Sequence, residues 1–188
     1  MAISELQVQS ALREVIDPNT GKDYVTSREL GEIRINSNNV SLEIVLSYPA
    51  KSLFENIRSQ VIEKLKMIPD IGEIEVNISS KIISRATQRG VQHIPEVKNI
   101  IAVASGKGGV GKSATAVNLA LALAYEGASV GILDADIYGP SQPQMLGVSG
   151  RPESKDGKHM EPLEAHGIQI ISIGLLVDIE TPMVWRGP

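Results

Sequence analysis

One short stretch of the chain, residues 105–113, has the residue types and spacing needed to hold a phosphate group. It reads Ser-Gly-Lys-Gly-Gly-Val-Gly-Lys-Ser and fits the pattern G-x-x-x-x-G-K-[ST] from Gly106 to Ser113. Glycines lack a Cβ, so their backbone N–H groups can approach an anion closely. In this pattern Lys112 reaches the β- and γ-phosphates, and the Ser113 hydroxyl binds Mg²⁺. The residues expected to line the site are Gly106, Lys107, Gly108, Gly109, Val110, Gly111, Lys112, Ser113 and Ala114.

The segments on either side of this loop favour the same interpretation. Residues 100–104 form a short apolar run, which predicts a strand buried on both faces. Residues 114–124 are rich in Ala and Leu, which form helices best, and Gly127 is placed to end that helix. A strand, a glycine loop and a helix in this order would direct the loop amides and the positive end of the helix dipole at an anion.

Two aspartates follow the next apolar run. Residues 130–134 predict another parallel strand, and Asp134 and Asp136 lie at its carboxyl end, the edge where such sheets bind ligands. An aspartate there can polarise an attacking water or support Mg²⁺ through coordinated waters. The two would point to the same side if the strand continued. Residues 137–141 fit a nucleotide-sensing loop and a plain turn equally well.

Residues 1–80 predict a small α+β domain of order α-β-β-α-β. A capping box at Ser4 opens a helix, and a second helix covers residues 53–65. Alternating apolar residues predict three strands, near residues 33–35, 40–46 and 74–78. In the first helix the residues at helical spacing are Leu6, Leu12, Val15 and Ile16.

Residues 81–98 are polar and predict a linker, and residues 99–188 predict the N-terminal part of a P-loop NTPase domain. Another strand is expected at residues 168–173. The expected fold class is therefore α/β, with a doubly wound, mostly parallel sheet that is incomplete here, preceded by the small α+β domain.

The composition narrows the classes of function. The chain has 188 residues, a formal net charge of -4 and no cysteine. This charge predicts no broad basic surface for nucleic acid, and the lack of cysteine excludes thiolate metal sites within these residues. There is no run of 18 apolar residues and no N-terminal signal pattern, which predicts a cytoplasmic protein without a membrane partner.

The segment from Lys107 to Ser113 resembles the deviant Walker A signature. Its extra lysine separates MinD and ParA ATPases, nitrogenase iron protein and the Mrp/ApbC iron–sulfur carriers from ordinary P-loop ATPases. The resemblance implies that Lys107 acts across a homodimer on the partner's ATP, in a role like that of an arginine finger. It also implies that Asp136 orients the attacking water. Lys107, Lys112 and Asp136 are thus the expected catalytic residues.

The sequence resembles the Mrp/ApbC branch in residues 134–141, 145–147 and 185–188. It resembles the small iron–sulfur assembly domain that precedes this branch in bacterial Mrp proteins in residues 17–18, 30–33, 48–50 and 71–74. The resemblance implies an ATP-hydrolysing carrier that binds a [4Fe–4S] cluster and transfers it to apo iron–sulfur proteins. The family's paired cluster cysteines and second aspartate motif would lie beyond Pro188, so this piece alone is expected to be inactive. The small-domain cysteine of some relatives is also missing from residues 47–51.

Two other functions stay open at this point. A MinD/ParA-type localisation ATPase would act on a membrane or DNA through a terminal amphipathic helix or a basic face, and the visible sequence shows neither. A nucleotide-gated docking module would bind ATP without significant turnover. A comparison of ATP affinity with turnover separates the docking module from an ATPase.

Overall fold

The computed structural model describes residues 3–84 and 94–177 and divides the chain into two compact units, Met1–Asn99 and Ile100–Pro188. Part of the predicted linker, residues 85–93, and the segment 185–188 lie outside the described residues. The first unit contains α1 (Glu5–Leu12), β1 (Leu30–Asn36), β2 (Asn39–Leu46), a 3-10 turn (Lys51–Leu53), α2 (Phe54–Leu65) and β3 (Ile74–Ser80). The second contains α3 (Lys112–Tyr125), β4 (Val130–Asp134), α4 (Gln142–Leu146), β5 (Leu163–Ala165), β6 (Ile168–Ser172) and a 3-10 turn (Ile173–Leu175).

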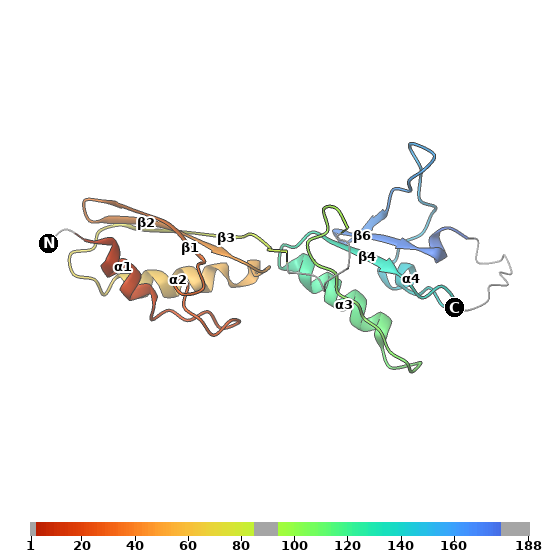
Figure 1. Ribbon diagram of the computed structural model, residues 1–188, viewed down its shortest axis with the longest axis horizontal. Helices are drawn as coiled ribbons and strands as arrows, with labels where there is room; N and C mark the ends of the chain where they lie inside the picture. The colour runs from red at the N-terminus through yellow and green to blue at the C-terminus, as the bar shows by residue number, and fades with distance from the viewer. Residues whose placement is uncertain (1–2, 85–93, 178–188) are drawn as a thin grey trace. The chain divides into compact units, whose positions relative to one another are not determined.

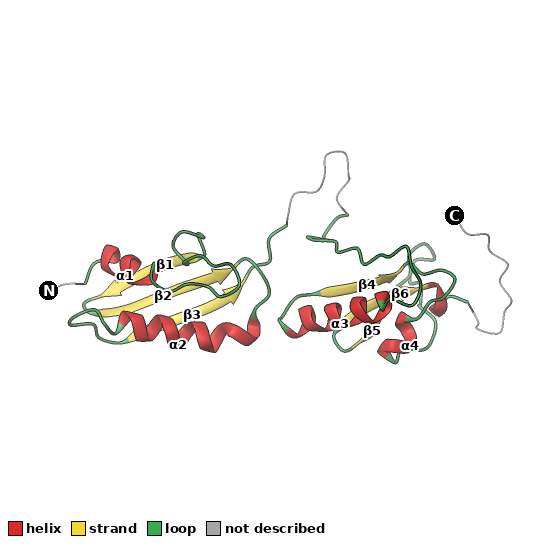
Figure 2. Cartoon of the chain, turned by 90° about the horizontal axis from the view of Figure 1, so that it is seen from below, coloured by secondary structure: helices red, strands yellow, loops and turns green. Residues whose placement is uncertain are grey.

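The first unit is a three-stranded sheet, order β1-β2-β3, with its helices packed on one face (Figure 2). A two-residue hairpin turn joins β1 to its antiparallel neighbour β2, and Ser37 in that turn has a φ of 58°. β2 and β3 are parallel because α2 carries the chain back across the sheet between them. The predicted capping box forms at Ser4, whose hydroxyl accepts a hydrogen bond from the Gln7 N–H.

The core of this unit comes from alternate residues of β2 and from one stripe of each helix. The four predicted inward residues of β2 are all buried, as the two-residue period of a strand requires. In α1 the predicted apolar stripe is partly wrong, because Leu6 and Ile16 are exposed and Val8 is buried instead. The helix ends at Leu12, so Ile16 is beyond its last turn. The buried residues from β2, α1 and α2 are Val40, Leu42, Ile44, Leu46, Val8, Leu12, Ile57, Val61 and Leu65.

The second unit has a sheet of order β4-β6-β5, in which β4 and β6 are parallel. Helices α3 and α4 pack on the face that carries Ile132 and Ile170 (Figure 1). Leu133, on the other face of β4, is 74% exposed. The described residues therefore show a mixed α/β unit with helices on one face. The doubly wound arrangement is not confirmed.

Two features of this unit differ from the sequence prediction. No strand forms over residues 100–104, where Ile100 and Ile101 are more than half exposed. A strand buried on both faces needs paired neighbours and covering layers, and the described residues of this unit supply neither there. Strand β5, which the sequence did not predict, pairs antiparallel with β6. His166 and Gly167 connect the two strands, and their φ angles of 53° and 72° suit a two-residue hairpin turn.

Candidate functional site: the phosphate loop and its supports

The glycine-rich loop lies directly before α3 and is open to solvent. Gly109 and Gly111 have φ angles of 72° and 88°, which explains why glycine stands at these positions. At Gly106 and Gly108 φ is not positive, and no atom of the described residues lies within 4 Å of the position that a Cβ would take. Packing among residues 3–84 and 94–177 thus gives no reason for these two glycines. A phosphate group approaching the backbone would give one, so the loop fits the anion that its sequence predicts.

The start of α3 adds positive potential to the same place. Gly111 is its N-cap and makes no side-chain capping hydrogen bond, so the first N–H groups of the helix have no side-chain acceptor at the cap. Lys112 and Ser113 are the first two helical residues and are half-buried. The Ser105 hydroxyl holds the loop backbone, accepting from the Lys107 N–H at 3.1 Å and donating to the Lys107 carbonyl oxygen at 3.2 Å.

The charges of the two loop lysines are unpaired within the described part of the chain. Within residues 3–84 and 94–177, neither the Lys107 nor the Lys112 ammonium group forms an ion pair with a carboxylate. Lys107 is exposed. Together with the α3 dipole, these charges favour a polyanionic ligand such as a triphosphate.

The two aspartates at the end of β4 have different environments. Asp134 is only 9% exposed and accepts three hydrogen bonds, from the Asp136 N–H at 3.1 Å, the Gln142 N–H at 3.2 Å and the Ser172 hydroxyl at 3.0 Å. Strand β4 ends at Asp134, so the condition for the two side chains to share one side is not met. Asp136 is exposed and accepts one hydrogen bond, from the Gly139 N–H at 3.2 Å. Asp134 is therefore an anchor of the local fold, and Asp136 is accessible for chemistry.

Sequence reasoning missed two residues that support the site. Ser172 pairs with Asp134 in the parallel register of β4 and β6, so its position at the end of a neighbouring strand was a usable signal. Gln142 gave no such signal. Its side-chain Nε2 donates to the Ser113 carbonyl oxygen at 3.2 Å and links α4 to the start of α3.

The first unit contains a separate buried polar cluster. Both carboxylate oxygens of the fully buried Asp17 accept from the Tyr48 hydroxyl, at 2.9 and 2.8 Å. Glu29, also buried, accepts from the Ser47 N–H at 2.9 Å and the Ser47 hydroxyl at 2.8 Å. Burial, with the Asp17 hydrogen bond and charge as further causes, raises the pKa of Tyr48 to about 12. Burial likewise raises the pKa of Tyr24.

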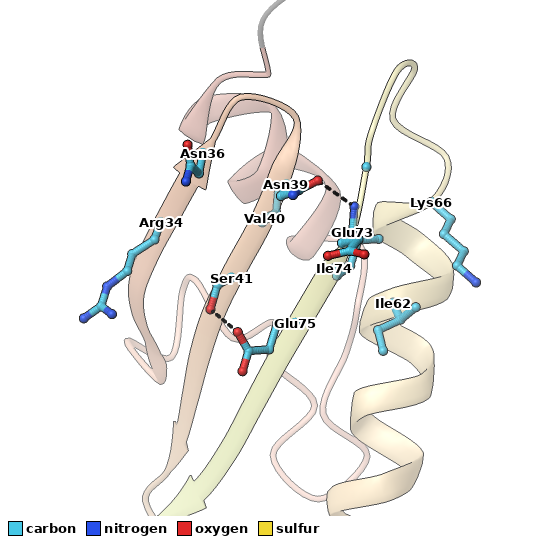
Figure 3. Close-up of a pocket in the computed structure, with 11 residues that line it drawn as sticks. Arg34, Asn36, Asn39, Val40, Ser41, Ile62, Lys66, Glu73, Ile74 and Glu75 are labelled. Carbon is cyan, nitrogen blue, oxygen red and sulfur yellow. Dashed lines mark hydrogen bonds between the residues drawn. The ribbon is translucent and has the colours of Figure 1, made fainter.

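A groove of about 650 Å³ in the first unit is distant in sequence from the phosphate loop (Figure 3). Strands β1, β2 and β3 and helix α2 line it, with Ile62 and Lys66 on the helix side. Two hydrogen bonds join residues of its lining, since the Glu73 N–H donates to Asn39 at 2.9 Å and the Ser41 hydroxyl donates to Glu75 at 3.1 Å. Arg34, Asn36 and Lys66 are further polar residues of the lining.

The described residues contain no group of three or more His, Asp or Glu side chains that could hold a metal ion, and the full sequence has no cysteine. No helix in the described parts of the chain is both long and apolar enough to span a bilayer.

Each of the two units matches the model of a known protein family. Residues 96–188 match the model of the NUBPL iron-transfer P-loop NTPase family, and residues 5–78 match the model of the iron–sulfur cluster assembly protein family. The chain is 43% identical over 185 residues to an iron–sulfur cluster carrier protein of Synechocystis, covering 96% of this chain and 52% of the relative. It is 46% identical over 182 residues to the protein of the same description in Escherichia coli K12, covering 96% and 49%.

A third such carrier, from Pseudomonas fragi, is 56% identical over 120 residues, covering 63% of this chain and 42% of the relative. The chain thus spans about half the length of these curated relatives. A crystal structure of a domain of unknown function, DUF59, from Bacillus anthracis is 28% identical, with a TM-score of 0.37, covering 39% of this chain and 72% of that one.

Proposed function

This chain belongs to the Mrp/ApbC-type family of iron–sulfur cluster carriers with a P-loop NTPase domain, and from that membership we propose that it binds MgATP at residues 106–114. The full-length protein would hydrolyse ATP to ADP and phosphate and transfer a [4Fe–4S] cluster to apo iron–sulfur proteins. The observation that supports the nucleotide site best is the open loop before an uncapped helix, with glycines at 106 and 108 that the fold itself does not require.

Each residue of the loop has a proposed part in binding. The backbone N–H groups of residues 106–111 would surround the phosphate oxygens, and the Lys112 ammonium would bind the β- and γ-phosphates. The Ser113 hydroxyl would hold Mg²⁺, which when bound neutralises charge on the phosphate oxygens. The Ser113 carbonyl oxygen accepts a hydrogen bond from Gln142, which ties the first turn of α3 to α4.

Asp136 is the better candidate for positioning the attacking water. Its carboxylate is exposed and makes a single hydrogen bond, so it can accept a proton or hold a water. The three hydrogen bonds on Asp134 occupy that carboxylate and favour a structural part for it. The exposed Lys107 would extend to the ATP of a second copy in a homodimer. A cytoplasmic location remains a prediction.

The cluster is cargo in this proposal, and its ligands would not come from these 188 residues. Cluster binding in proteins relies on cysteine thiolates, and this sequence contains none. The net charge of -4 gives the alternative of a DNA-binding localisation ATPase no support.

Titration calorimetry with MgATP, together with a phosphate-release assay, tests the nucleotide site in the full-length protein. A Lys112 hydrogen bond to phosphate contributes roughly 1.5–3 kcal/mol, so Lys112→Ala should weaken ATP binding by about tenfold or more. Asp136→Asn should keep ATP affinity while turnover falls strongly. An unchanged dissociation constant in the lysine variant would refute the site, and ATP binding by the parent without turnover would favour the docking module.

Mixing variants tests the part proposed for Lys107. Lys107→Ala should retain ATP binding and lose hydrolysis. Heterodimers of this variant with Asp136→Asn should regain activity at one of their two sites, where an intact Asp136 meets the partner's intact Lys107. If heterodimers form and no activity returns, Lys107 acts within its own chain or has no catalytic part.

A further inference from the structure

Gln142 connects three elements around the phosphate loop. It is the first residue of α4 and is only 4% exposed. Its backbone N–H donates to Asp134 Oδ2 at the end of β4, and its side-chain Nε2 donates to the Ser113 carbonyl oxygen in α3, both at 3.2 Å. One residue therefore joins the strand end, the start of α4 and the helix that follows the phosphate loop.

The remaining polar atom of this side chain is unsatisfied. Gln142 Oε1 is buried and has no hydrogen-bond partner among the described residues. The orientation of the Gln142 amide is fixed, because the Ser113 carbonyl oxygen can only accept a hydrogen bond and so must face Nε2. A buried acceptor without a donor is unfavourable. An alternative local arrangement that brings a donor to Gln142 Oε1 would therefore gain one hydrogen bond that the arrangement in this structure lacks.

Residues 136–141, the segment that leads into α4, are exposed at their middle and packed at the end nearest α4. Ile137 and Tyr138 are at least half exposed. At the packed end, Pro140 packs so closely on Gly174 that a Cβ added there would lie 3.2 Å from the proline ring, and Gln142 follows two residues later. A shift of the first turn of α3 would reach this end of the segment through the Gln142 side chain.

We propose that Gln142 is a positioning residue that couples nucleotide occupancy of the phosphate loop to the conformation of residues 136–141. In the nucleotide-bound arrangement, Oε1 accepts a hydrogen bond from a backbone N–H of this segment. A ligand can shift a conformational equilibrium only if the two conformations differ in their interactions, and this added hydrogen bond is such a difference. The coupling rests on the proposed MgATP site and would set Asp136 in place only when ATP is bound.

The test uses the full-length protein with a slowly hydrolysed ATP analogue and Mg²⁺, and reads amide hydrogen exchange over residues 136–141. Gln142→Met keeps the side-chain length and removes both amide atoms. Gln144→Met is the matched control, since Gln144 is exposed on the same short helix. The parent and control should both show slower exchange in this segment when the analogue binds.

We expect Gln142→Met to bind the analogue within about threefold of the parent, to lose the protection of residues 136–141, and to show a kcat at least tenfold lower. Parental protection and kcat in this variant would overturn the proposal. If it does not fold, Gln142→Leu takes its place, and failure of both to fold or bind would assign Gln142 a structural role alone. Absence of analogue binding by the parent would refute the MgATP site, whereas binding without slower exchange would refute only the coupling.

Discussion

Replacing Asp134 by asparagine should destabilise the second unit by about 1.5–3 kcal/mol, roughly the contribution of one hydrogen bond to a charged group. The carboxylate accepts three hydrogen bonds, and Asn can keep the bond from the Asp136 N–H through its one carbonyl oxygen. The Ser172 hydroxyl can rotate to accept from the new amide group. The Gln142 N–H cannot rotate, so in this orientation it would face another donor and lose its partner. The flipped amide would keep the Gln142 and Ser172 bonds and leave the Asp136 N–H without an acceptor, so one hydrogen bond is lost in either orientation.

The measurement is urea unfolding of the full-length protein, followed by circular dichroism, with Asp136→Asn as the matched control. Asp136 is exposed and makes one hydrogen bond to the Gly139 N–H, which an asparagine oxygen can also accept. The control should stay within about 0.5 kcal/mol of the parent. Equal stability of both variants would show that the Asp134 network is not what holds this end of β4.

Three further predictions concern the first unit and the chain as a whole. Leu65→Ala should lower the free energy of unfolding of a piece covering residues 1–80 by about 2–5 kcal/mol, because Leu65 is fully buried, whereas exposed Met67→Ala should change it by less than about 0.5 kcal/mol; calorimetry on the two variants checks this. A raised pKa means that the neutral Tyr48 phenol is favoured in the folded state, so the contribution of Tyr48 to stability should be fully present below its ordinary pKa of 10.0 and be lost as pH rises toward about 12. Urea unfolding of Tyr48→Phe over this range should show a smaller fall in stability than the parent, and an identical pH dependence would refute the Asp17–Tyr48 argument. Anaerobic reconstitution of the 188-residue piece with iron and sulfide should yield no stable [4Fe–4S] absorbance after desalting, because the piece has no cysteine.

The sequence predicted elements best where the pattern itself reports burial. The alternation along β2 places Val40, Leu42, Ile44 and Leu46 on one side, so these four could be assigned to the core directly, while Val45 lies on the other face. Ile16 is misassigned because helical spacing does not show where a helix ends, whereas Leu6 lies within α1 on its exposed side. The strand predicted over residues 100–104 is absent for a different reason. Apolar composition favours burial, but a strand also needs hydrogen-bonded neighbouring strands, which come from segments distant in the sequence.

The candidate site was predictable in its loop and less so in its supports. Gly106 through Ser113 form one continuous motif, so their types and spacing carry the prediction without any tertiary knowledge. Asp134 and Asp136 look equivalent in sequence and differ only because β4 ends at the first of them. Gln142 acts through a contact with Ser113, 29 residues away, which no local pattern reports.

Cluster transfer from the full-length protein tests the central claim most directly. The purified protein would be reconstituted anaerobically with iron and sulfide, desalted, and mixed with an apo-enzyme whose activity requires a [4Fe–4S] cluster, in the presence of a chelator that captures free iron. The account predicts a stable cluster spectrum and recovery of the apo-enzyme's activity, with Lys112→Ala changing the dependence of transfer on MgATP. A full-length protein that holds no cluster, or holds one and activates no acceptor, would contradict the assignment as a cluster carrier.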